Sequence, residues 1–323
     1  MKWIEKMNTL GASHTPFLFI IDFEMQDPFV CELNKLGNED ILYKIGGLNN
    51  FDNDNEISRE TIPPIIKKTP IGYDDYLQAF DFVVGKQKQG YSYLLNLTFP
   101  SKIEINTSLK DIFYKSNARY KLFFKDEFIV FSPEIFIQIK DGQVASYPMK
   151  GTIDASIGNA EEIILSNEKE KAEHATIVDL IRNDLSTVAS NIRVENYRYV
   201  EKIRTNQKDL LQVSSKITGS LPPDYHNGLG TVFEKLLPAG SICGAPKIKT
   251  LELIKKAENY KRGYYTGIFG IFDGNNVDCG VMIRFIEKKD GIFYYKSGGG
   301  ITTMSNPEDE YNELINKIYV PFG

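Results

Sequence analysis

The stretch Pro148-Met149-Lys150-Gly151-Thr152 places a lysine on a glycine turn, 16 positions after the acid of Ser132-Pro133-Glu134. Two neighbouring strands that deliver a lysine and a carboxylic acid together supply a nucleophile and a proton donor. A lysine amine at pH 7 is almost wholly protonated, with about 0.04% free base at its ordinary pKa. Lys150 therefore needs burial or nearby positive charge to lower its pKa before it can attack.

Expected strands group on either side of a helical middle section. The expected strands are 17–22, 91–97, 119–124, 128–131, 135–139, 264–272, 277–286 and 292–296, and the expected helices are 74–86, 161–189, 229–237, 248–257 and one that begins near residue 307. Residues 46–74 are loop-rich and form the weakest point of the chain. This grouping predicts an α+β fold with large sheets rather than an alternating dinucleotide fold.

Turn, cap and stripe signals refine this outline. Asp141-Gly142 and 273–276 are expected hairpin turns, and Asn306 followed by Pro307 is a helix start. An apolar stripe on the helix 248–257 is expected to face the core, and it consists of Ile248, Leu251, Ile254 and Ala257.

Composition and charge exclude several classes of protein. The chain has 323 residues and a net charge of −5, so we expect no nucleic-acid partner, which would require a basic face. No run approaches the ~20 apolar residues of a membrane span. The first apolar run, 17–21, is too short and too late for a signal peptide. Three cysteines without CxxC spacing favour a reduced, cytoplasmic location.

Two expected helices each carry a pair of carboxylates three residues apart, Glu170 with Glu173 and Glu310 with Glu313. Residues at this spacing share one helix face. If the two helices converge, the four acids can hold Mg²⁺, which takes few protein oxygens and keeps some water. Surface acids on solvated helices are the alternative reading of either pair.

A glycine run and an isolated arginine complete the candidate site. Gly298, Gly299 and Gly300 close a strand and can bring backbone N–H groups close to an anion, as in a nest, or form a plain strand-end turn. Arg284 lies in an otherwise apolar strand, where a guanidinium needs a partner. That partner is either an internal acid or a bound ligand.

Taken together, these motifs resemble those of a known family. They occur in the order 148–152, 173–184, 237–247, 283–284, 298–301 and 310–313. From about residue 70 to the C-terminus the chain resembles the chorismate-utilising enzymes, which include anthranilate, aminodeoxychorismate, isochorismate and salicylate synthases. The resemblance implies a fold like that of anthranilate synthase component I, with large mixed or antiparallel sheets packed face to face and helices outside. It also implies one catalytic domain, 1–323, with a shortened N-terminal part, 1–70, before the family core, 71–323.

The resemblance also indicates a reaction. Anthranilate synthases carry alanine where this chain has Lys150, whereas aminodeoxychorismate synthases carry lysine. Isochorismate and salicylate synthases need a water-activating lysine where this chain has Leu94. The implied reaction is therefore chorismate plus ammonia giving 4-amino-4-deoxychorismate, for 4-aminobenzoate and folate synthesis. The rival functions are that of anthranilate synthase component I and that of a catalytically silent chorismate-binding partner.

Roles and partners carry over by position. Lys150 resembles the nucleophile that attacks ring carbon C2, and Glu134 resembles the general acid for the C4 hydroxyl. A separate glutamine amidotransferase subunit is expected to deliver ammonia, and a separate lyase to remove pyruvate from the product. Gln212 stands where many members have a histidine linked with pyruvate elimination, and Cys243 stands where threonine is common. We expect Cys243 to be a small packed side chain rather than a reactive one.

The resemblance also implies the remaining ligands. Glu173 and Glu313 resemble the Mg²⁺ ligands, with Glu170 and Glu310 as supporting acids. The implied contacts to the substrate ring and its carboxylates come from Gly151, Thr152, Tyr264, Arg284, Gly298, Gly299, Gly300 and Lys317.

Overall fold

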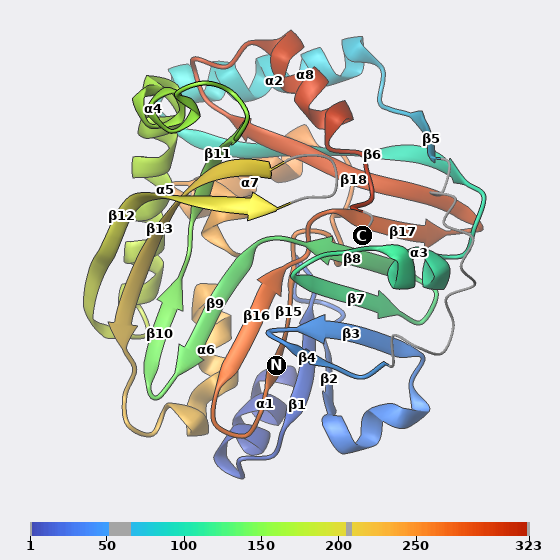
Figure 1. Cartoon of the computed structure of the whole chain (residues 1–323), viewed down its shortest axis with the longest axis vertical. Helices are drawn as coiled ribbons and strands as arrows, with labels where there is room; N and C mark the ends of the chain where they lie inside the picture. The colour runs from blue at the N-terminus through green and yellow to red at the C-terminus, as the bar shows by residue number, and fades with distance from the viewer. Residues whose placement is uncertain (1, 52–65, 205–208, 322–323) are drawn as a thin grey trace.

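The computed structural model describes residues 2–51, 66–204 and 209–321, and these ranges form two nine-stranded antiparallel sheets (Figure 1). The first sheet has the order β11-β13-β10-β9-β16-β15-β1-β2, with β12 paired to β13. Its strands are β1 (Phe17–Ile21), β2 (Phe29–Glu32), β9 (Ile135–Lys140), β10 (Gln143–Ser146), β11 (Met149–Asp154), β12 (Ser190–Arg204), β13 (Asp209–Ser220), β15 (Ile268–Phe272) and β16 (Val277–Val281).

The second sheet has the order β14-β6-β18-β17-β8-β7-β3-β4, with β5 paired to β6. Its strands are β3 (Ile41–Ile45), β4 (Leu48–Asn49), β5 (Ile66–Thr69), β6 (Leu94–Ile105), β7 (Tyr120–Phe124), β8 (Phe128–Ser132), β14 (Gly244–Ala245), β17 (Phe285–Lys289) and β18 (Ile292–Ile301). Residues 2–51 thus supply strands to both sheets.

Helices cover the outer faces of this pair of sheets. They are α1 (Lys2–Ala12), α2 (Tyr73–Lys88), α3 (Leu109–Lys115), α4 (Ala160–Ser166), α5 (Glu168–Ser186), α6 (Leu229–Leu236), α7 (Lys247–Ala257) and α8 (Pro307–Asn316), with short 3-10 helices η1 (Leu33–Asn38), η2 (Tyr225–Gly228) and η3 (Gly240–Ile242). Helix α1 packs on α6, and α2 packs on α7 and α8, with α2 and α8 side by side at the top of Figure 1. None of the helices in the described ranges is long and apolar enough to cross a membrane.

Strand β1 shows why the sheets pack face to face. All five of its residues are buried, and successive side chains point to opposite faces of a strand. Leu18 and Ile20 belong to a cluster that includes Val130 and Phe285 of the second sheet, whereas Phe19 contacts Phe233 of α6. Each such buried side chain contributes roughly 1.5–3 kcal/mol to folding. The first sheet is therefore a middle layer, with the second sheet on one face and helices on the other.

The expected outline is largely confirmed, with corrections where tertiary contacts decide. The helix expected over 161–189 is two helices, because Asn167 ends α4 and caps α5 by accepting from the Glu170 N–H. The strand expected over 277–286 divides into β16 and β17 at Arg284, whose φ is 54°. The sequence outline missed several elements, including α1, α3, β2, β3, β4, β5, β12 and β13. Of the loop-rich stretch 46–74, residues 52–65 lie outside the described residues.

Local turn and cap signals were reliable. Asp141 and Gly142 both have positive φ, 50° and 74°, in the hairpin between β9 and β10. The Asn306 side chain accepts hydrogen bonds from the Glu308 and Asp309 N–H groups at the start of α8. These motifs depend on contacts within a few residues, so their sequence signatures suffice.

The apolar stripe expected on α7 was only partly right. Ile254 and Ala257 are buried, but Ile248 is 75% exposed, and Thr250 and Leu253 are buried instead. Thr250 faces inward because its hydroxyl bonds to Ser92 near the start of β6. The helix is therefore rotated about its axis relative to the expectation.

Candidate active site

Lys150 lies in strand β11 rather than on a turn. This strand pairs with β13, and its register shifts between Lys150 and Thr152, which marks a β-bulge at Gly151. Gly151 has a φ of 77°, which glycine adopts without strain. A Cβ there would lie 3.4 Å from Oε2 of Glu170, so the bulge brings the backbone close to α5. Thr152 is exposed.

The Lys150 ammonium contacts a carboxylate of α5. Its Nζ donates to Oε2 of Glu173 at 3.1 Å, and the two side chains are 25% and 7% exposed. Burial lowers the pKa of Lys150, but the charges of Glu173, Glu170 and Glu313 outweigh it and leave the pKa above its ordinary value. This corrects the expected lowering of the Lys150 pKa, since the acids around the lysine dominate in this state.

The glycine run is neither a nest nor a turn. Gly298, Gly299 and Gly300 continue strand β18, pair with β6, and lie outside the positive-φ region. Pairing of β18 with β17 stops at Lys296, so one side of the glycine strand lacks that neighbour. A Cβ on Gly300 would lie 3.3 Å from Nζ of Lys150, and one on Gly299 would lie 3.3 Å from Oε2 of Glu310. The glycines therefore leave room for the charged side chains.

Glu134 lies immediately before β9, within range of three cations. Its Oε1 accepts a hydrogen bond from the Ser241 hydroxyl at 2.7 Å. Burial raises the pKa of the Glu134 carboxyl, against the lowering effects of Ser241, Lys150, Lys317 and Arg284. A carboxyl that stays protonated near neutral pH can act as a general acid. Ser241 was missed as a site residue, although it lies within the quoted motif 237–247.

Two further cations border Glu134. The Arg284 guanidinium lies 4.8 Å from the ring centre of Tyr319, and it forms no ion pair with an acid in the described ranges. Lys317 donates to the Gly298 carbonyl at 2.8 Å and pairs with Glu313. Of the two partners expected for Arg284, an internal acid and a ligand, this arrangement favours an anionic ligand.

The four predicted metal-ligating acids lie on α5 and α8, near the lysine and the glycine strand. Glu173 contacts Lys150, and Glu310 and Glu313 approach Gly299. Residues 2–51, 66–204 and 209–321 contain no group of three His, Cys, Asp or Glu side chains placed to hold a metal ion together. Mg²⁺ often uses only one or two carboxylates plus water and substrate oxygens. The carboxylate donors therefore fit the chemistry of Mg²⁺, and the magnesium site stays a prediction.

The structure does not bring Tyr264 to this group. Its hydroxyl donates to the Asp27 carbonyl at 2.6 Å, and its ring stacks on Phe128. The neighbouring Tyr265 is buried, and it is close enough to Glu134 and Arg284 for their charges to affect its pKa. Tyr265 is therefore the better candidate, and two adjacent tyrosines offer no signal in the sequence that separates them.

The structure shows the surroundings of the three positions at which this chain has a different residue from those common in related enzymes. Leu94 is buried, and its Cδ1 would lie 3.0 Å from a Cβ on Gly300, the glycine that Lys150 approaches. Gln212 is buried opposite Thr152 in β13, and its amide donates to Ser214 at 3.1 Å. Cys243 is fully buried, and burial raises the pKa of its thiol to about 12, as expected for a packing residue.

The fold and these motifs define a class of chorismate-converting enzymes. The chain matches the chorismate binding enzyme family over residues 30–322, and it belongs to that family. The match includes all of the residues of the candidate site and the whole second sheet, whereas strand β1 of the first sheet lies before it.

Individual relatives agree with this membership. An uncharacterized PabA-like protein of Haemophilus influenzae is 49% identical over 319 residues, which are 99% of this chain and 96% of that protein. Anthranilate synthase component I from Streptococcus pneumoniae has a TM-score of 0.66 and 27% identity, and the match covers 80% of this chain and 59% of that one. MenF, the menaquinone-specific isochorismate synthase from Escherichia coli, has a TM-score of 0.74 at 14% identity, covering 98% and 79%. The expected α+β fold is thereby confirmed.

Proposed function

We propose that this protein is the chorismate-aminating component of a 4-amino-4-deoxychorismate synthase. The observation that carries the proposal is the position of Lys150, whose amine reaches the glycine strand beside Leu94 and within range of Glu134. This arrangement is explained if the Lys150 amine attacks the chorismate ring and the Glu134 carboxyl gives a proton to the group that leaves the same ring. Leu94 cannot activate water, which opposes a hydroxyl-transferring reaction.

The chemistry follows from two linked displacements. The Lys150 ammonium first gives a proton to the Glu173 carboxylate that it contacts, and takes it back when Lys150 is released at the end of the cycle. The free amine of Lys150 bonds to ring carbon C2 while the C4 hydroxyl takes a proton from Glu134 and departs as water. Ammonia then bonds to C4, the bond between C2 and Lys150 breaks, and the surplus proton of the new amine returns to the Glu134 carboxylate. The protons balance over the cycle, since an alcohol and ammonia become an amine and water.

Binding of the dianionic substrate requires fixed positive charge. Arg284, Lys317 and the open side of the Gly298–Gly300 strand are the proposed contacts to its carboxylates. Glu173 and Glu313 would hold Mg²⁺, with Glu170 and Glu310 in support. A bound dication would withdraw electrons from the ring through the substrate carboxylate.

Partners are part of the proposal. A separate glutamine amidotransferase subunit would supply ammonia, and a separate lyase would convert the product to 4-aminobenzoate. The PabA-like name of the relative from Haemophilus influenzae supports a place in 4-aminobenzoate synthesis. A cytoplasmic location accords with this pathway.

The decisive test is a product assay with purified protein, chorismate, Mg²⁺ and ammonium. We expect 4-aminobenzoate only when the lyase is added. Direct formation of anthranilate would instead identify anthranilate synthase component I, a candidate that the similarity to the enzyme of Streptococcus pneumoniae favours. Chorismate binding without turnover at high ammonium would indicate a silent binding protein.

A further inference from the structure

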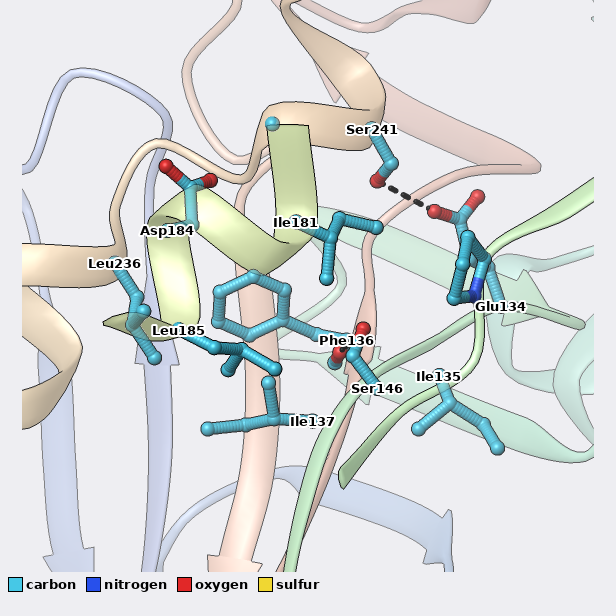
Figure 2. A pocket seen from close by; sticks show the side chains of 12 residues that line it. Glu134, Ile135, Phe136, Ile137, Ser146, Ile181, Asp184, Leu185, Leu236 and Ser241 are labelled. Atoms are coloured by element: carbon cyan, nitrogen blue, oxygen red, sulfur yellow. Dashed lines mark hydrogen bonds between the residues drawn. The ribbon is translucent and has the colours of Figure 1, made fainter. Parts of the chain in front are cut away.

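A small cavity lies beside Glu134, between β9, α5 and η3 (Figure 2). Its volume is about 20 Å³. A cavity needs roughly 10–15 Å³ of such space to hold one water molecule. The cavity therefore has room for about one molecule of the size of water or ammonia.

Polar groups occupy two sides of this cavity. Figure 2 shows Glu134, bonded to Ser241, on one side and Asp184 on the other, with Ile181 and Phe136 between them. Asp184 pairs with Lys247 at 2.8 Å, and their side chains are 18% and 16% exposed. The ion pair on the Asp184 side is thus partly exposed to solvent, while Glu134 borders the cavity and is within range of Lys150, Lys317 and Arg284.

The residues that line the cavity favour neutral ammonia over the ammonium ion. The walls are mainly apolar, with Ile137, Leu185 and Leu236 in addition to Ile181 and Phe136. An ammonium ion would lose most of its hydration against these mainly apolar walls, which costs more than the transfer of a neutral molecule. Neutral ammonia has the size of water and three N–H donors. The Glu134 and Asp184 carboxyls and the Ser241 hydroxyl are acceptors on the same cavity.

We propose that this cavity is a holding site for neutral ammonia, with the Asp184–Lys247 pair as its outer boundary. This inference rests on the proposed amination. Glu134 donates its proton to the hydroxyl that leaves C4, so a molecule held beside Glu134 is next to the carbon that must accept nitrogen. The site supplies the nitrogen for the second displacement, and the proton it loses returns to Glu134.

Gly240 provides a specific way to disturb the outer side of the cavity. A Cβ on Gly240 would lie 2.9 Å from Oδ2 of Asp184 and 2.9 Å from Cδ2 of Leu180, and Gly240 lies outside the positive-φ region. Gly240→Ala should raise the KM for ammonium about tenfold, the equivalent of one lost hydrogen bond, and leave the KM for chorismate unchanged. Gly85→Ala is the matched control, because no atom lies within 4 Å of its added Cβ.

A second pair of variants tests the charge at the boundary. Asp184→Asn replaces a carboxylate acceptor of the ammonia N–H groups with a weaker amide acceptor and should also raise the KM for ammonium. Asp184→Asn combined with Lys247→Met leaves no unpaired cation but still lacks the carboxylate, so its KM for ammonium should stay raised. The double variant also keeps the test valid if Asp184→Asn alone folds poorly.

The outcomes separate this inference from the proposed function. If wild-type protein aminates chorismate but every cavity variant keeps the wild-type KM for ammonium, the holding site is wrong and the proposed function stands. A rise in the KM for chorismate of the same size would show general damage and also overturn it. If wild-type protein aminates nothing at any ammonium concentration, the proposed function fails, and the cavity loses its ligand with it.

Discussion

Two ion pairs in this protein differ in how many N–H donors of the cation find an acceptor within the protein. Arg262 and Glu258 are each 1% exposed, and Arg262 donates to Glu258 through two nitrogens. Its remaining donors reach the carbonyls of Ile242 and Asn96 and the Thr266 hydroxyl. All five donor groups of the guanidinium are satisfied inside the protein. This pair ties η3 and β6 to the end of α7.

The Lys150–Glu173 pair is the open counterpart. Lys150 is 25% exposed and has three N–H donors, and Glu173 is its one hydrogen-bond acceptor among the described residues. A closed pair has no donor left for a ligand, and removal of one partner leaves a buried charge without compensation, which destabilises the fold. An open pair keeps N–H donors available for a substrate, and substitution of its cation should lower the free energy of unfolding less than substitution in a closed pair. The predictions that follow test this difference.

The largest effect is expected from Lys150→Ala. Loss of the proposed nucleophile should lower kcat by several orders of magnitude. Because the Lys150 side chain is 25% exposed, water can take its place beside Glu173, so the loss of unfolding free energy should be smaller than the loss expected for the closed pair. Product formation and urea unfolding measure the two quantities. An active Lys150→Ala protein would remove the covalent route and leave Lys150 as a binding residue.

Glu134→Gln should lower kcat by about 10²–10⁴-fold, the range for loss of a general acid. Since burial raises the pKa of Glu134, its protonated form persists to higher pH than in a free glutamate, and activity should fall as pH rises through that pKa. The charged groups that face Glu134 are Lys150, Lys317 and Arg284. Variants of these three residues serve as controls, because each could also cause activity to fall as the pH rises. An unchanged falling limb in the pH profile of Glu134→Gln would assign it to another group.

Glu258→Gln should cost about 3–5 kcal/mol of unfolding free energy, because it leaves the buried Arg262 charge unbalanced. Urea unfolding measures this loss. The double variant Glu258→Leu with Arg262→Met should recover much of it, since it removes both charges together. Recovery would show that the closed pair acts on stability. A Glu258→Gln protein of wild-type stability with slow turnover would contradict the division into closed and open pairs.

Lys121 extends the comparison to a buried cation with no carboxylate partner in the described ranges. Its Nζ donates to the Ser116 carbonyl at 2.7 Å and lies 4.5 Å from the ring centre of Phe113. Burial lowers the pKa of Lys121 to about 8. Above pH 8 the unfolded chain binds more protons than the folded one, so stability should rise with pH by up to about 3 kcal/mol before the unfolded lysine titrates near 10.4.

The measurement for Lys121 is the difference in unfolding free energy between wild type and Lys121→Met at several pH values from 7 to about 10. This difference should move in favour of wild type as the pH rises. Parallel curves for the two proteins would mean that Lys121 keeps its charge or its ordinary pKa in the folded state.

Local signals and distant contacts account for what could be predicted. The Asn306 cap, the Asp141-Gly142 turn and the strands that contain Phe17 and Phe128 were predicted, because each depends on a few neighbouring residues. The rotation of α7 was not, since it follows from the bond between Thr250 and Ser92, 158 positions apart. Likewise, Ser241 joins the site through its hydrogen bond to Glu134, and Tyr265 lies within range of the charges of Glu134 and Arg284, and no sequence spacing predicts either arrangement.

The sequence by itself determined the family, the α+β architecture, and the residue types that a lysine nucleophile and an acid require. A motif is defined by the order of its residues in the sequence, so it can be recognised without the coordinates. Only the tertiary structure decided that the Lys150 amine contacts Glu173, that the glycines form a strand that Lys150 and Glu310 approach closely, and that a small cavity joins Glu134 to Asp184. These depend on packing between segments far apart in the chain, where charge, burial and shape are set jointly.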